Sequence, residues 1–377
     1  MSEARAPQVR ALLALRVLVV ALVIVNVPQL RSPEAERMRE IVAAPGHPYR
    51  DIPIEYPIGD LPLIRAVGVN GSDGARIALA VLAFTADLVA YAALMRGWGR
   101  PAAARYLLYG APLLVFIYRR SDLVAVALAT AAFASVRRGR ERGGGVALGI
   151  AALVKLWPLV LAPALLVARR FRAFIAFAVT FVLGVAVWVM VGGVSALTQV
   201  TSFRGATGWE LESGVGAVVW ALTGTYRFEA GANRTGSIPG WSKAILLTIL
   251  ISGLVAIWWR DRAHTVDPSG LPALAAVALL LVTAPVLSPQ YLCWLLPWAA
   301  IGAADDRRLG RLAAVPIALT GAIMAAWFLG LTQGHPLWSQ TALIIRNLSL
   351  LTVPLAWLWA SGSGRSGRST RIRMSLP

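Results

Sequence analysis

Cysteine, histidine and charge are all scarce in this chain of 377 residues. The one cysteine, Cys293, lies inside an apolar run, which excludes a disulfide or a cysteine metal site within one chain. The three histidines, His47, His264 and His335, are scattered and lack metal-ligand spacing. Charged residues make up only 14% of the chain, whereas hydrophobic residues make up 58%. This apolar excess is too large for a soluble protein and indicates a membrane protein.

The net charge of +18 could suggest a nucleic-acid partner. Basic residues that bind nucleic acid gather on one soluble face, whereas those of this chain recur between apolar runs. We therefore interpret them as signals of membrane topology, with no nucleic acid as partner.

The apolar runs predict an all-α polytopic membrane protein with about twelve transmembrane helices. The first run follows Arg5 and Arg10 as in a signal peptide, but it lacks a small-x-small exit, so we expect a retained helix. The expected spans are 11–30, 75–95, 103–118, 122–136, 144–155, 156–168, 173–192, 242–259, 271–287, 291–303, 312–331 and 341–360. Residues 1–360 are expected to form one transmembrane domain, without internal repeats.

Charge asymmetry predicts that both termini are cytoplasmic. With that orientation the inner segments hold 22 of the 36 basic residues, including Arg16 and the arginines of 137–142, 169–172 and 365–373, together with Arg262. The outer segments hold 11 of the 18 acids: Glu34, Glu36, Glu40, Asp51, Glu55, Asp60, Asp73, Asp122, Glu210, Glu212 and Glu229. Two outer segments are long, 31–74 and 193–241, so we expect any chemistry on that side. The tail 361–377 is rich in Gly, Ser and Arg and is predicted to be disordered and cytoplasmic.

Two of the expected spans, 144–155 and 156–168, are shorter than the roughly 20 residues needed to cross the hydrocarbon. They indicate a re-entrant or broken pair, the only such break that the sequence suggests, with a cleft beside Lys155. Lys155 would lie at the outer end of this hairpin and could bind phosphate or extend into the lipid headgroups.

The first outer segment carries candidate general bases. A partly desolvated carboxylate such as Glu34 or Asp51 could deprotonate a sugar or lipid hydroxyl. The alternative, which composition favours, is a solvated amphipathic helix from Pro33 to Ala44 followed by a proline-stiffened loop. Glu55 and Tyr56 end that loop and are candidate substrate contacts.

Several polar residues lie where apolar ones are expected. Arg119 and Arg120 could bind a phosphate, or Arg120 could pair locally with Asp122. Arg346 lies inside the last span and could be a second phosphate contact or belong to an internal ion pair. Asp87 could be the acid of that pair or a proton relay.

A second group borders the later outer loops. Glu212 lies in Gly-Trp-Glu-Leu-Glu-Ser, and Gln290 and Tyr291 lie in Ser-Pro-Gln-Tyr-Leu-Cys-Trp. Aromatic rings and carboxylates of this kind can stack on sugars and accept their hydroxyl protons. An aromatic belt at the membrane interface has the same composition.

Taken in order, the segments PYRDIPIEYP, RRSDLVAVALATAAFASVRRGRERGGGVALGIAALVKLWPLVLAP, GWELES, SPQYLCWLLP and RNLSLL resemble one family. It comprises the GT-C-type, polyprenol-phosphate-mannose-dependent glycosyltransferases classed as glycosyltransferase family 87, which are common in actinobacteria. The resemblance implies a GT-C-type bundle with a large first outer loop in a bacterial plasma membrane.

The resemblance also implies an inverting transfer of a sugar, mannose in the typical member, from a polyprenyl phosphate to a lipid or glycan acceptor. An acid of the first outer loop would activate the acceptor, and no cofactor is implied. Family members commonly show an acid followed four residues later by tyrosine, where this chain has Glu34 and Met38. Glutamate is one methylene longer than aspartate, so its carboxylate lies farther from the backbone. Such misplacement of a catalytic group can cost about 100-fold in rate. At Tyr56-Pro57 this chain continues with isoleucine where the family has a second proline.

Two other functions remain open on the residues alone. A lipid or ion transporter or flippase would also use intramembrane Arg346 and Asp87, although such folds show matching halves with corresponding broken helices. An inactive family member could bind the lipid-linked sugar as a subunit of cell-envelope assembly. The sequence leaves open the donor sugar, the acceptor, the choice between Glu34 and Asp51, a requirement for divalent metal and the oligomeric state.

Overall fold

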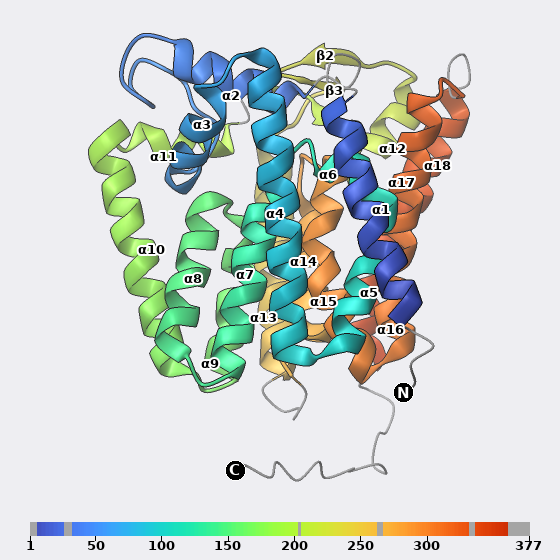
Figure 1. Cartoon of the computed structure of the whole chain (residues 1–377). Helices are drawn as coiled ribbons and strands as arrows, with labels where there is room; N and C mark the ends of the chain where they lie inside the picture. The colour runs from blue at the N-terminus through green and yellow to red at the C-terminus, as the bar shows by residue number, and fades with distance from the viewer. Residues whose placement is uncertain (1–5, 26–31, 203–204, 262–266, 332–335, 361–377) are drawn as a thin grey trace, which may run out of the picture.

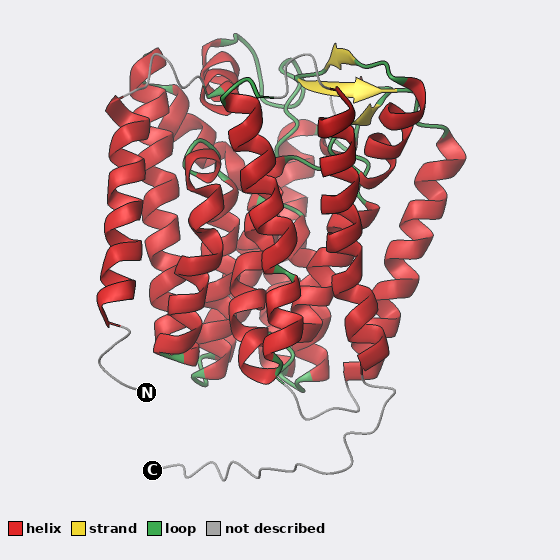
Figure 2. Ribbon diagram, turned by 90° about the vertical axis from the view of Figure 1, so that its right-hand side faces the viewer, coloured by secondary structure: helices red, strands yellow, loops and turns green. Residues whose placement is uncertain are grey.

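The computed structural model describes residues 6–25, 32–202, 205–261, 267–331 and 336–360. The expected tail 361–377, Arg262, His264 and His335 lie outside the described residues. Within the described part the protein is a helical bundle, with a small sheet at one end (Figures 1 and 2). We call that end, which carries α2 (Pro33–Ala43), α3 (Leu61–Gly68) and the sheet, the loop-rich end.

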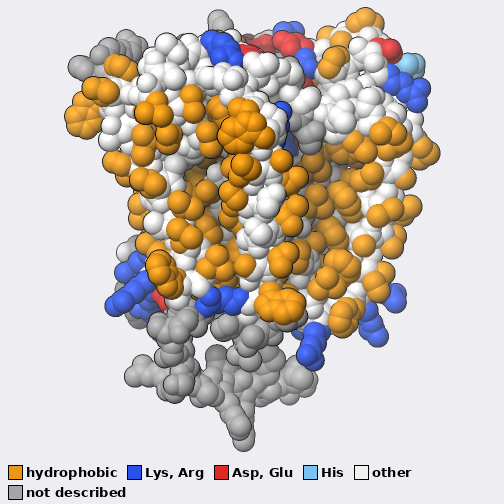
Figure 3. Space-filling view, turned by 180° about the vertical axis from the view of Figure 1, so that it is seen from behind, with side chains coloured by type: hydrophobic (Ala, Val, Ile, Leu, Met, Phe, Trp, Pro, Cys, Tyr) orange, Lys and Arg blue, Asp and Glu red, His pale blue; other side chains and the backbone are white. Residues whose placement is uncertain are grey.

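Six described helical stretches are long and apolar enough to cross a membrane: Pro7–Val25, Ser72–Trp98, Phe171–Gly192, Gly240–Asp261, Arg307–Phe328 and Pro336–Trp359. They lie in α1 (Ala6–Val25), α4 (Ser72–Trp98), α10 (Phe171–Gly192), α13 (Gly240–Asp261), α16 (Arg307–Leu312) with α17 (Ala314–Phe328), and α18 (Pro336–Ala360). The flank of the bundle is covered by apolar side chains, and Lys and Arg side chains gather at its lower edge (Figure 3). These features establish an all-α protein of multi-pass membrane character.

The remaining predicted spans are also helical, but they are shorter or interrupted. They are α5 (Arg100–Gly110) with η3 (Ala111–Leu113) and α6 (Leu114–Ile117), α7 (Asp122–Arg137), α8 (Glu141–Val154), η4 (Trp157–Leu161) with α9 (Ala162–Val167), α14 (Leu271–Thr283), and η6 (Pro289–Leu295) with α15 (Leu296–Asp305). The count of twelve crossings therefore stays a prediction, since only six described stretches meet the length and hydropathy of a full span.

Proline breaks the bundle at more places than 144–168, where we expected the one interruption. A 3₁₀ turn with proline in its first turn also occurs at Pro112 and at Pro289. Proline has no N–H to donate and favours the first turn of a helix, so each break starts a new short helix. The breaks around Lys155 and Gln290 lie beside the long loops, since Lys155 contacts Asp60 and Ser288 donates to Glu210.

The loop-rich end is built from two long segments. The first holds α2, η2 (Ile58–Asp60) and α3, so the expected helix from Pro33 to Ala44 is confirmed to within one residue. The second holds α11 (Ser195–Thr201), α12 (Gly214–Thr223) and three short strands that the sequence did not predict: β1 (Trp209–Glu210), β2 (Arg227–Glu229) and β3 (Ala232–Thr235). They form an antiparallel sheet of order β1-β3-β2, in which Trp209 pairs with Thr235 and Arg227 with Arg234.

Candidate functional site

Charged side chains from four separate elements meet near the loop-rich end of the bundle. Glu34 lies in the first turn of α2, Asp60 ends η2, Arg120 precedes α7 and Lys155 follows the last residue of α8. We call Glu34, Asp60, Arg120 and Lys155 the charged cluster. It joins the long first loop to the broken helix at 154–157, which is where the sequence predicted a cleft beside Lys155.

Lys155 is the centre of the charged cluster. Its ammonium Nζ lies 2.9 Å from Asp60 Oδ2 and 3.9 Å from Glu34 Oε1. The same nitrogen lies 4.5 Å from the centre of the Tyr56 ring, a cation–π contact. Asp60 is fully buried and Lys155 is 15% exposed, so the lysine is held by the protein and does not extend freely into lipid headgroups.

Glu34 is buried against the loop before α7. Ser32 caps α2 by accepting from the N–H of Ala35, and Pro33 starts the helix, which fixes the first turn where Glu34 lies. The backbone N–H and the hydroxyl of Ser121 both donate to Glu34 Oε1. Arg120 lies 3.7 Å from Glu34 Oε2. The helix is amphipathic, as expected, but Glu34 lies on its buried face and not in solvent.

Arg120 therefore pairs with Glu34, whereas the proposed local pair with Asp122 is not found: Asp122 Oδ1 accepts from Trp294 Nε1 at 2.9 Å. The neighbouring Arg119 is half-buried, and burial together with the charge of Arg120 lowers its pKa to about 10. Two adjacent guanidinium groups that repel each other provide a favourable environment for a phosphate.

Aromatic rings form a stack beside Asp122. The rings of Tyr291 and Trp294 are 4.4 Å apart at 23°, and those of Trp294 and Trp157 are 5.3 Å apart at 12°. The pKa of Asp60 is raised to about 6, chiefly by burial and also by the charges of Glu34 and Asp122, against the opposing effect of Lys155. Carboxylates, cations and ring faces thus lie within electrostatic reach of one another.

A second polar group lies between the second long loop and α18. Arg346 is fully buried, donates to the backbone oxygen of Glu212 and lies 3.6 Å from its carboxylate. Glu210 accepts from the Ser288 hydroxyl at 2.9 Å. The pKa of Glu212 is raised to about 8, chiefly by burial, with Arg346 opposing the increase and Glu210 adding to it. Gln290, predicted at this border, is buried in η6.

Arg346 is therefore one half of an internal pair, as the alternative interpretation proposed, but its acid is Glu212. Asp87, suggested as that acid, instead pairs with Arg16 at 2.9 Å and accepts from the hydroxyls of Tyr106 and Tyr118. Arg16, which the sequence placed among the basic residues of the inner segments, is buried within α1 with 1% of its side chain exposed.

Asp51 and Glu55 lie apart from the charged cluster. Asp51 is exposed, and its carboxylate accepts from the backbone N–H of His47 at 2.7 Å, which closes the turn of residues 47–52. Glu55 forms an ion pair with Arg37 at 3.1 Å. Both contacts stabilise the first loop.

Sequence reasoning missed Asp60, Ser121 and Trp157 as members of these groups. Asp60 was counted only among the outer acids, although Gly59 before it and Pro62 after it mark a tight turn that could have singled it out. Within the described ranges, no three His, Cys, Asp or Glu side chains group as a metal ion would require. The arrangement offers carboxylates as bases and paired cations for an anion.

Comparison with known families adds an independent observation. The sequence profile of glycosyltransferase family 87 matches residues 56–289, more than half of the chain. The matched range holds Tyr56, Asp60, Arg120, Lys155 and Glu212, while Glu34 precedes it. No curated protein matches the chain.

Proposed function

The chain belongs to glycosyltransferase family 87, and from that premise we propose that it transfers a sugar from a polyprenyl-phosphate donor to a lipid or glycan hydroxyl. Mannose is the sugar we favour. The observation that carries the proposal is the charged cluster, in which two buried carboxylates and two cations from four elements meet at one point. We place this end of the bundle outside the cytoplasm of a bacterial plasma membrane, and both termini inside.

Glu34 is the base in this proposal. Its Oε1 accepts from Ser121, whereas among the described residues Oε2 has only the ion pair with Arg120 at 3.7 Å. Oε2 therefore has lone pairs for the hydroxyl of an acceptor. Glu34 takes the hydroxyl proton as the acceptor oxygen bonds to the anomeric carbon. Asp51 is the weaker candidate, since it is exposed and closes a turn.

Lys155 and Arg120 stabilise the leaving group. The bond between the anomeric carbon and the phosphate oxygen breaks, and its electron pair stays on the polyprenyl phosphate. Fixed positive charge in a site poor in water stabilises that developing anion more than water would. Attack on the face opposite the phosphate inverts the anomeric centre. Asp60 positions Lys155, and the half-buried ring of Tyr291, at the end of the aromatic stack, is the one we propose to stack on the sugar.

The test is transfer by purified protein in lipid nanodiscs. Labelled polyprenyl-phosphate mannose and a membrane-lipid acceptor fraction are expected to give labelled product and free polyprenyl phosphate. Glu34→Gln should lower kcat by at least about 100-fold, in the range of general-base catalysis. Glu40→Gln is the matched control, because Glu40 is on the same helix with 63% of its side chain exposed.

Three other results would count against the proposal. Binding of donor without turnover would favour the inactive subunit, and donor flux across liposomes without transfer would favour the flippase. Full activity in both Glu34→Gln and Asp51→Asn would remove the assigned bases.

A further inference from the structure

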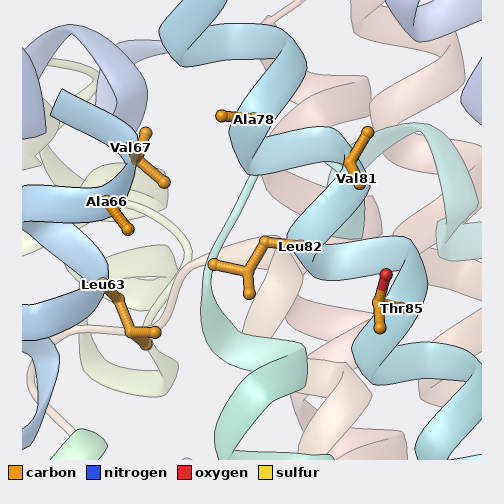
Figure 4. Close-up of a pocket in the computed structure, with 7 residues that line it drawn as sticks. All are labelled: Leu63, Ala66, Val67, Ala78, Val81, Leu82 and Thr85. Carbon is orange, nitrogen blue, oxygen red and sulfur yellow. The ribbon is translucent and has the colours of Figure 1, made fainter. Parts of the chain in front are cut away.

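An apolar groove lies between α3 and α4, lined by residues outside the charged cluster (Figure 4). Its volume is about 450 Å³, within the range of small-molecule sites. Leu63 and Val67 line it from α3, and Ala78 and Leu82 line it from α4. Thr85 provides its one hydroxyl. A groove this apolar suits a hydrocarbon and offers almost nothing to a polar ligand.

The walls of the groove are firmly held. Gly68 of α3 lies so close to α2 that a Cβ there would be 2.5 Å from the Met38 carbonyl oxygen. Ile64, Val67 and Leu79 bury their side chains in one apolar cluster beside the groove. The space between α3 and α4 is therefore defined by packed helices, and a ligand would not have to separate them.

The residues that line the groove directly follow a residue of the charged cluster in the sequence. Asp60, which binds Lys155, is followed directly by Leu61, the first residue of α3, and Leu63 already lines the groove. Gly59 packs against the end of α8, where a Cβ would lie 2.6 Å from the Leu153 carbonyl carbon. One short turn thus connects the cations that suit a phosphate to a wall that suits a hydrocarbon.

We propose that this groove binds the isoprenoid chain of the donor, next to a phosphate held by Lys155 and Arg120. The inference rests on the proposed function. A polyprenyl phosphate has the matching order of parts, since its phosphate is bonded directly to the end of one linear chain of isoprene units. The α3 wall, with 8 residues, is roughly 12 Å long by the helical rise, so it accommodates the first isoprene units of one chain.

Filling the groove provides the first test. Ala78→Trp places an indole between α3 and α4, and Val89→Trp adds the same ring to an exposed position farther along α4 as matched control. For a long-chain donor, Ala78→Trp should raise KM by at least about tenfold, equivalent to 1.4 kcal/mol of lost binding. For a donor with two isoprene units, whose chain contacts less of the groove, the change should be several-fold smaller. Equal KM values for the long donor in wild type and Ala78→Trp would overturn the inference and leave transfer itself intact.

A binding readout keeps the inference testable without turnover. Polyprenyl phosphate with a diazirine on its second isoprene unit is photolysed with the full chain in nanodiscs, and the labelled peptides are identified by mass spectrometry. We expect label on α3 and α4 of the wild type. This label should be lost in Ala78→Trp and should persist in Val89→Trp. Label elsewhere in the bundle overturns the inference, as does displacement by plain phospholipid but not by unlabelled polyprenyl phosphate. Absence of sugar transfer, by contrast, would count only against the proposed function.

Discussion

Lys155 and Asp60 form a short ion pair, 2.9 Å from ammonium to carboxylate, between residues that are far apart in the sequence. Lys155 is one of two lysines in the chain, and it lies where α8 breaks. An ammonium fixed in this way cannot swing toward solvent when an anion arrives. In the proposed reaction, this pair preorganises positive charge for the phosphate before the donor binds.

Removing the ammonium should impair the proposed reaction. Lys155→Met keeps the length of the side chain and removes its charge, so we expect kcat for transfer to fall by about 100-fold or more. Lys155→Arg should retain part of the activity, because a guanidinium can still pair with phosphate oxygens. Steady-state kinetics measure the effect, with Lys243→Met as control since Lys243 is exposed at the start of α13. Wild-type kcat in Lys155→Met would refute the assigned role.

The ionisation of Asp60 should make kcat/KM depend on pH in the acidic range. Its carboxyl has a pKa raised to about 6, mainly by burial, and only the ionised form holds Lys155 as an ion pair. As pH falls through about 6, Asp60 gains a proton and the pair weakens, so kcat/KM should fall. Asp60→Asn should be slower at neutral pH and should lack this acidic limb. A variant with the same limb as wild type would show that another group titrates there.

Some residues of the charged cluster were predicted from the sequence and others were not. Lys155 and Arg120 stood out because a cation beside an apolar run needs an explanation. Asp60 did not stand out, because an acid in a long polar loop is ordinarily solvated, and only the packing of η2 against α8 buries it. Its burial depends on contacts between distant segments, which periodicity does not encode.

The sequence predicted the helices better than the pairing of buried charged residues between them. Long apolar runs determine helices such as α4 and α10 within a few residues, because backbone groups in lipid must bond within their own segment. The pairing of Asp87 with Arg16 joins residues 71 positions apart. Nothing local distinguishes that acid from one that would pair with Arg346, so the sequence left its partner open.

The Arg16–Asp87 pair should stabilise the fold without taking part in transfer. Asp87→Asn leaves a buried guanidinium without its counterion, which typically costs about 3–5 kcal/mol. Asp73→Asn is the control, on the same helix with 71% of its side chain exposed. Thermal unfolding in detergent should show a lower Tm for Asp87→Asn and little change for Asp73→Asn.

A double variant separates the loss of the charge pair from the loss of packing. Replacing both Arg16 and Asp87 by leucine removes both charges and should recover much of the lost Tm, because apolar replacements of buried ion pairs are often neutral. A double variant no more stable than Asp87→Asn would show that the contacts of Asp87 with Tyr106 and Tyr118 matter more than the charge.

Glu212 should make the protein less stable in alkaline solution. Burial raises its pKa in the folded chain to about 8, above the usual 4.5 of an unfolded glutamate. The folded chain therefore retains a proton that the unfolded chain releases, and the stability that this proton contributes is fully present below pH 4.5 and lost as pH rises through 8. Glu212→Gln has no such proton, so its Tm should fall less than that of wild type between pH 6 and 9.

Glu229→Gln is the control in the same loop: the pKa of Glu229 is lowered to about 2, so that residue is ionised in both states throughout this range. If wild type and Glu212→Gln lose Tm in parallel, Arg346 keeps Glu212 ionised and the pair is a permanent salt bridge.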